Sequence, residues 1–150
     1  MFHQSLHAAS SRSHLNCSQV RVEHCISDVQ VAVDQWREDL GNRALWKECI
    51  AKIDQLKAGL DDHIVRIAGE GVLEDAVVRC PSLYTSVRAV ESWQERLAIQ
   101  LSSIIDRLRR WSGNDDEAKQ ISKDVQEFRH EFVNEEREER HLIDRGLGSN

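Results

Sequence analysis

Apolar residues recur along the chain at intervals of three and four, the spacing of one side of an α-helix. The first run begins at residue 22 and stops before Gly41, a residue type favoured just past a helix C-terminus. Its apolar positions are Val22, Ile26, Val29, Val33, Trp36 and Leu40. The pattern predicts a first helix that packs one face against the rest of the protein.

A second run has the same spacing and fades at the sequence GEG, residues 69–71. Its apolar positions are Trp46, Cys49, Ile53, Leu56, Leu60, Ile64 and Ile67. A short apolar piece follows as far as Cys80 and predicts another turn or two of helix.

Pro81 opens the third run, at a position where a helix tolerates proline. The third run occupies Leu83, Val87, Val90, Gln94, Leu97, Leu101, Ile104, Leu108 and Trp111. The sequence SGNDDE then breaks it, and Asn114 or Asp115 can cap a fourth helix. The fourth run occupies Ala118, Ile121, Val125, Phe128, Phe132, Glu135, Glu139 and Leu142.

Four amphipathic helices of about 20 to 30 residues with short loops favour antiparallel neighbours. We therefore predict an all-α fold, an up-down-up-down four-helix bundle over residues 14–145. Three helices with a long hairpin is the competing arrangement. Residues 1–13 are rich in Ser and His and lack acids, which predicts a disordered tail, and residues 146–150 are predicted to be a flexible C-terminus.

Polar residues interrupt two of the apolar runs. Gln94 lies within the third run, and Glu135 and Glu139 lie within the fourth. Glu131 lies about 60° from the centre of the fourth run, at roughly 100° per residue. A buried carboxylate persists only if it is paired, protonated or bound to a cation.

Counting residues from the loops places His24, His63, Gln94 and the region around Val133 in one layer. Glu70 also falls on the apolar face of the second helix. Three interpretations stay open at this point: a solvated, charged end of the fourth helix, a buried polar network without metal, and a metal site.

Charge and composition narrow the functional classes. The net charge is −6, and residues 115–144 hold eleven Asp or Glu against five Lys or Arg. No basic patch with interleaved aromatics occurs, and no apolar run reaches the length of a membrane span, so we expect neither nucleic acid nor membrane as a partner. The four cysteines form no CxxC pair, which favours free thiols and a cytoplasmic location.

Catalytic motifs are absent from the sequence. There is no H-E-x-x-H zinc motif, phosphate loop or nucleophile elbow. No serine or cysteine has a base nearby on the helical map, so catalysis is not predicted.

Three short motifs resemble the hemerythrin-like family, also called the HHE cation-binding domain, over about residues 14–145. They are Glu23-His24, the L-x-x-H spacing of Leu60 and His63, and Glu131-Phe132-x-x-Glu135-Glu136. An alternative register in the fourth helix runs from His130 to Glu135. The resemblance implies four antiparallel helices whose inward His and acidic residues hold two iron ions.

This chain departs from the family pattern at three positions. Ile67 stands where the family has an acid, and Gln94 and Glu131 stand where it has histidines. The resemblance therefore implies a degenerate site with one iron, manganese or zinc ion, although the absence of any cofactor stays equally open.

The predicted site residues follow from this resemblance. The predicted metal ligands are His63, Glu131, Glu135, His24 and Glu70, supported by Gln94 and Glu139. Such a site suits the sensing or storage of a metal or a small ligand. The alternative is a non-catalytic interaction or scaffold domain with a lost metal site, which presents its acidic fourth helix to a basic partner or forms a homodimer through Val20 and Val31.

Overall fold

The chain is almost entirely helical. The computed structural model describes the backbone of residues 2–146 and the side chains of residues 17–146. The α-helices are α1 (Phe2–Glu38), α2 (Arg43–Glu70), α3 (Val72–Arg79), α4 (Tyr84–Arg110) and α5 (Asp115–Gly146), and a 3-10 helix, η1 (Pro81–Leu83), precedes α4. No β-strand occurs in these residues. The predicted all-α class is confirmed, with five α-helices rather than four because the short apolar piece before Cys80 forms α3.

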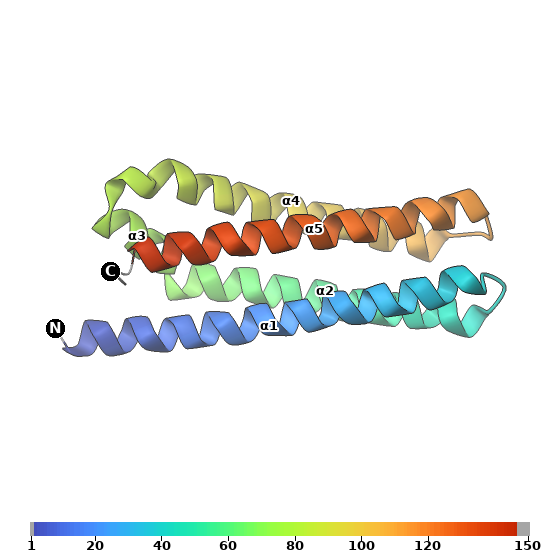
Figure 1. Ribbon diagram of the computed structural model, residues 1–150, viewed down its shortest axis with the longest axis horizontal. Helices are drawn as coiled ribbons and strands as arrows, with labels where there is room; N and C mark the ends of the chain where they lie inside the picture. Colours follow the sequence, from blue (N-terminus) through green and yellow to red (C-terminus); the bar gives the residue numbers. More distant parts are fainter. Residues whose placement is uncertain (1, 147–150) are drawn as a thin grey trace.

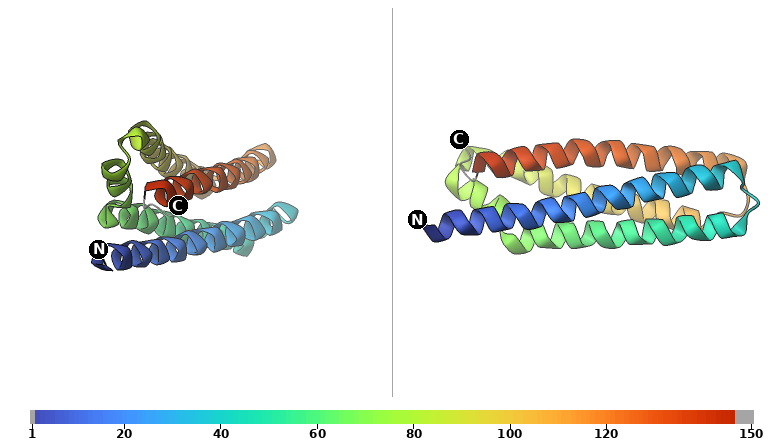
Figure 2. Two further views of the ribbon diagram at one scale, coloured as in Figure 1. Left: turned by 60° about the vertical axis from the view of Figure 1, so that its left-hand side comes forward. Right: turned by 60° about the horizontal axis from the view of Figure 1, so that its bottom comes forward.

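The four long helices lie lengthwise beside one another, with α1 and α2 in one layer and α4 and α5 in the other (Figures 1 and 2). Helix α1 packs along α2, α2 contacts α4, α4 packs along α5, and α5 contacts α1. The α1–α2 and α4–α5 loops lie at the same end of the molecule, which we call the loop end (Figure 1). At the other end α3 connects α2 to the start of α4 and packs on α5.

Local sequence sets the ends of these helices. The side-chain oxygen of Asn42 accepts a hydrogen bond from the backbone N–H of Ala44 at 3.0 Å and so caps α2. The side-chain oxygen of Asn114 accepts from the N–H of Glu117 at 3.0 Å, which makes Asn114 the cap of α5. Gly71 ends α2 with φ 64°, a left-handed conformation that glycine adopts without strain.

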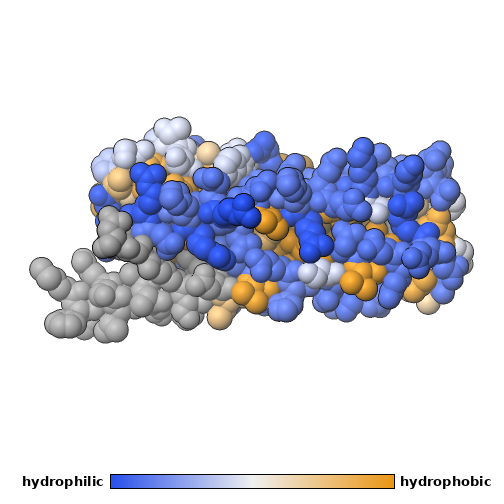
Figure 3. Space-filling view, in the orientation of Figure 1, coloured by the Kyte–Doolittle hydropathy of each residue, from blue (hydrophilic) through white to orange (hydrophobic). Residues whose placement is uncertain are grey.

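The apolar positions predicted to face inward form two buried clusters. The larger cluster joins α1, α2, α4 and α5 towards the loop end and includes Trp36, Ile53, Leu101 and Phe128. The smaller cluster lies at the other end, where α3 meets the last residues of α5. Its members are Ile67, Val72, Leu73, Ala76, Leu83, Val87, Val90, Leu142 and Ile143. The face of α1 and α5 in Figure 3 is mostly hydrophilic, with hydrophobic patches between these helices and on α1.

The predictions for the two ends of the domain have different outcomes. Helix α1 begins at Phe2, inside the stretch 1–13 for which the sequence predicts disorder. The side chains of residues 1–16 are outside the described set, and the disorder stays a prediction. At the C-terminus, Gly146 is the last residue of α5, and residues 147–150 lie outside the described residues. Within the described chain, no helix combines the length and apolar character needed to cross a bilayer.

All four cysteines are free thiols. Cys49 is buried in the larger cluster, Cys25 is half-buried and Cys17 is exposed. Burial, with a smaller contribution from Glu48, raises the pKa of the Cys49 thiol to about 12. Cys49 therefore acts as a small core residue at neutral pH.

Candidate functional site

A buried polar layer crosses the molecule at the level of His63. The Ser18 hydroxyl of α1 lies 2.5 Å from Nδ1 of His63 in α2. Nε2 of His63 lies 3.4 Å from Oε1 of Glu139 in α5. The side-chain amide of Gln94 in α4 donates to Oε2 of Glu139 at 3.4 Å. Each of the four long helices therefore contributes one member of this layer.

The two ring nitrogens of His63 face different partners. Nδ1 faces the Ser18 hydroxyl of α1, and Nε2 faces the Glu139 carboxyl of α5. Among the described residues, Oε1 of Glu139 has no hydrogen bond of good direction, although Nε2 of His63 lies at ion-pair distance. The contact between His63 and Glu139 is therefore electrostatic, because a hydrogen bond also requires alignment. His63 and Glu139 are only 3% and 4% exposed.

A second buried carboxyl, Glu136, lies beside this layer and faces α1. The Arg140 guanidinium donates to Oε1 of Glu136 at 2.7 Å and to Oε1 of Gln19 at 3.2 Å. Burial raises the pKa of Glu136 to about 8, and a hydrogen bond and charge repulsion from Glu23 add to the rise, while Arg140 opposes it. At neutral pH the contact between Glu136 and Glu23 therefore retains a proton.

Glu135 does not face α1. It lies in a separate pocket of about 380 Å³ between α4 and α5. The pocket is lined by Trp93, Arg96, Glu131, Asn134, Glu135, Arg137 and Glu138. Burial raises the pKa of Glu135 to about 7, and repulsion from Glu131 adds to this, whereas Arg96 lowers it. Because Arg96 already supplies a positive charge here, the two carboxylates do not make a free cation site.

Three of the sequence-predicted residues come together. His63, Gln94 and Glu139 form the middle and end of the layer. The sequence placed His63 and Gln94 at this level, but it put the contribution of the fourth helix near Val133, six residues before Glu139. The contacts that join them are a hydrogen bond between Gln94 and Glu139 and a close approach of the His63 ring to the Glu139 carboxyl.

The other predicted metal ligands lie elsewhere. His24 is exposed on α1 because it follows the buried Val22 by two residues, about 200° around the helix. Glu131 is exposed, and Glu70 is half-buried at the end of α2. In the part of the chain that the structure describes, no three His, Cys, Asp or Glu side chains are grouped to hold a metal ion.

Sequence reasoning missed Ser18, Gln19 and Glu136, all of which are buried. Ser18 lies four residues before Val22, so the first apolar run could have been extended to it. The helical repeat of 3.6 residues, continued from Phe132, falls between Glu135 and Glu136. The structure buries Glu136 and leaves Glu135 half-exposed.

Ser18, His63 and Glu139 have the residue types of a hydrolytic triad, which the sequence map did not place together. Hydrolysis by such a triad requires an accessible nucleophile and a group that stabilises the oxyanion, and both are missing here. Ser18 is 6% exposed and lies in the interior of α1, where backbone N–H groups are engaged in the helix and cannot stabilise an oxyanion. The contact between Ser18 and His63 therefore serves packing of α1 on α2.

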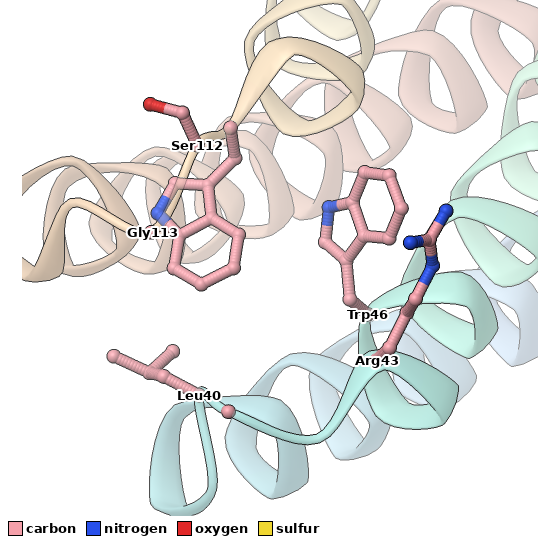
Figure 4. Close-up of a pocket in the computed structure, with 7 residues that line it drawn as sticks. Leu40, Arg43, Trp46, Ser112 and Gly113 are labelled. Carbon is pink, nitrogen blue, oxygen red and sulfur yellow. The ribbon is translucent and has the colours of Figure 1, made fainter.

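A solvent-open pocket lies at the loop end (Figure 4). Its volume is about 340 Å³. It is lined by Leu40, Gly41, Arg43, Trp46, Trp111, Ser112 and Gly113. Leu40, Arg43 and Trp46 come from the α1–α2 side, and Ser112 and Gly113 from the α4–α5 loop opposite (Figure 4). We call it the tryptophan pocket.

No protein-family model, curated protein or solved structure matches this chain. The resemblance to the hemerythrin-like family therefore rests on the short motifs alone.

Proposed function

We propose that this protein is a non-catalytic helical interaction domain, built as an up-down-up-down four-helix bundle with α3 covering one end. The cyclic order of helix contacts supports the bundle. One observation carries the function: Ser18, His63 and Glu139 of the polar layer are buried, whereas the tryptophan pocket is open to solvent. Binding pockets are usually concave and mostly apolar with few polar groups, and the tryptophan pocket has this composition.

The polar layer has a structural role in this proposal. Contacts between Ser18, His63, Gln94 and Glu139 join four helices at one level. A helix shifted by one turn would leave a buried carboxylate or imidazole without its partner, which is costly. The layer therefore favours one register of the helices over others.

We propose the hemerythrin-like resemblance as ancestry with a lost metal site. The fit of the predicted ligands is poor because His24 and Glu131 point to solvent and both ring nitrogens of His63 face protein groups. Elemental analysis of protein purified without chelator tests this. We expect no stoichiometric iron, manganese or zinc. Stoichiometric metal that is lost in both His63→Ala and Glu135→Ala would replace the interaction proposal with a metal-binding one.

The acidic fourth helix does not present a strongly negative surface. The exposed acids of residues 115–144 are Asp115, Asp116, Glu127, Glu131, Glu138 and Asp144. The exposed basic residues of the same stretch are Lys119, Lys123, Arg129, Arg137 and Arg140. The surplus of negative charge sits on buried or half-buried positions, so a basic partner for α5 is a weaker proposal than a ligand for the tryptophan pocket.

A homodimer through Val20 and Val31 stays a separate prediction. Both side chains are exposed, but His24 and Ser27 lie between them on the same side of α1 and interrupt the apolar surface. Sedimentation velocity over a range of protein concentrations tests it. The four free thiols agree with the proposed cytoplasmic location.

The interaction function is tested by selecting a random peptide library on the protein. Gly41 lines the pocket, and a Cβ there would meet no heavy atom within 4 Å, so Gly41→Leu narrows the pocket without a collision. We expect peptides that bind the wild type and are lost on Gly41→Leu. A selection that yields the same peptides on both proteins, or none on either, contradicts the proposal.

A further inference from the structure

We propose that the tryptophan pocket binds a segment of a partner protein in which an aromatic side chain lies next to a carboxylate. This inference rests on the proposed function and names its ligand. The aromatic group packs against the two indoles, and the carboxylate pairs with Arg43.

Both indoles are held in place without a ligand. Nε1 of Trp46 donates to the carbonyl oxygen of Leu108 at 2.9 Å, and Nε1 of Trp111 donates to the carbonyl oxygen of Asn114 at 2.7 Å. Trp36 supports Trp111 from the core through a T-shaped contact, with ring centroids 4.9 Å apart. The polar atoms of the two lining rings are therefore satisfied, and the remaining indole surface is suited to an apolar group.

This arrangement reduces the cost of binding. The rings come from two different hairpins and are fixed by backbone carbonyls, so little side-chain freedom is lost when a ligand enters. Indole faces and edges also favour an aromatic partner over an aliphatic one of the same size.

Arg43 supplies the charge that selects a carboxylate. It is the one cationic residue in the lining, and its guanidinium carbon lies 6.0 Å from the centroid of the Trp46 ring. Within the described part of the chain Arg43 has no ion-pair partner, whereas Arg107 pairs with Asp124 and Arg109 with Asp54. An exposed guanidinium beside an aromatic pocket is a ready donor to a carboxylate.

The size and walls of the pocket suit one side chain and a short piece of backbone. Its volume of about 340 Å³ is at the small end of ligand pockets. Gly41 and Gly113 form part of the wall, and a Cβ at either would meet open space within 4 Å. The partner backbone can therefore approach both loops closely.

Acidic residues flank this end of the protein, including Asp39, Asp115 and Asp116. Their long-range repulsion of an anion is largely screened at physiological ionic strength, while a direct contact with Arg43 is screened less. Measurements at about 0.15 M salt therefore report mainly the direct contact between the ligand carboxylate and Arg43.

The test uses three small derivatives of phenylalanine with different charges. They are N-acetylphenylalanine, which is an anion, its neutral amide, and phenylalaninamide, which is a cation. Binding is followed by the indole N–H resonances of the ¹⁵N-labelled protein. We expect Trp46 and Trp111 to shift with Kd on the order of millimolar, as suits so small a ligand. Trp93, which lines the separate pocket between α4 and α5, serves as an internal control.

We expect the anion to bind about fivefold more tightly than the neutral amide, which is the size of effect that a partly exposed ion pair supports. Arg43→Gln removes this preference and retains weak binding of both probes. Gly41→Leu weakens all three probes. Arg88→Gln, at an exposed arginine of α4 that pairs with Glu91, is the matched control and leaves the preference unchanged.

Equal affinity for the anion and the amide, tighter binding of the cation, or a preference that survives Arg43→Gln would overturn the inference. Probe binding that shifts neither the Trp46 nor the Trp111 indole resonance would also overturn the inference. The peptide selection separates this failure from failure of the proposed function. If selected peptides require an open pocket but contain no acid next to an aromatic residue, the interaction function stands and the carboxylate assignment falls.

Discussion

The two halves of the molecule use the same helices in different ways. Towards the loop end, the interface between layers is apolar and centred on residues such as Trp36 and Phe128. Beyond its middle, the interface becomes a polar layer around His63, and α3 then covers the end of α5. The apolar half supplies non-directional burial, and the polar half supplies contacts that are satisfied in one register only.

The largest expected effect is in the apolar half. Phe128 is 1% exposed within the larger cluster, so Phe128→Ala removes a buried ring and leaves a cavity. We expect the free energy of unfolding to fall by about 3–5 kcal/mol, measured by denaturant titration. Val133→Ala, at an exposed position of the same helix, is the control and costs less than about 0.5 kcal/mol. If Phe128→Ala lowers the free energy of unfolding by no more than a typical surface substitution does, this half is loosely packed.

The polar half should respond to substitution in a different way. His63→Leu leaves Glu139 buried beside an apolar group, and we expect a loss of about 2–4 kcal/mol. His63→Leu combined with Glu139→Leu removes both buried polar groups and should recover most of that loss. Thermal and denaturant unfolding of the two single variants and the double variant complete a cycle. Additive losses in the cycle would mean that the two side chains do not interact.

The sequence predicts the apolar half well and the polar half only partly. The three-and-four spacing identifies buried positions such as Ile26 and Leu101 because burial there needs only a continuous apolar face. In the polar layer, burial depends on pairing between helices, so composition alone does not separate Glu135 from Glu136. The two residues are about 100° apart around α5, so a rotation of the helix by less than that angle decides which of them is buried.

The tryptophan pocket could not be predicted from spacing at all. It depends on how two loops, far apart in sequence, meet at one end of the molecule. The apolar runs predict that Trp46 and Trp111 lie on the inward faces of their helices, but not the hydrogen bonds to Leu108 and Asn114 that orient them. Those contacts involve backbone carbonyls, which carry no signal in the sequence.

The junction of α3 and α5 gives a smaller test within the polar half. A Cβ at Gly146 would overlap both the Cβ and the Cα of Ala76, so the two helices approach closely there. We expect Gly146→Ala to lower the free energy of unfolding by about 1–3 kcal/mol and to speed hydrogen exchange in α3. Gly69→Ala is the control, since a Cβ at Gly69 of α2 meets nothing within 4 Å, and it should stabilise by about 0.5–1 kcal/mol. Unchanged exchange in α3 would contradict this close packing.

The smallest expected effect is a dependence of stability on pH that belongs to the polar half. Burial raises the pKa of Glu135 to about 7 and of Glu136 to about 8, from an ordinary 4.5. The folded protein therefore holds these protons more tightly than the unfolded chain, and the free energy of unfolding falls as pH rises from about 4.5 to about 8. Replacing both residues by glutamine should stabilise the protein by about 1–2 kcal/mol at pH 8 and have little effect at pH 4.5. Glu127→Gln, at an exposed position of α5, is the control for the loss of a charge alone. If the double variant gains the same stability at both pH values, these carboxyls are solvated, and the polar half is not the pH-sensitive part of the fold.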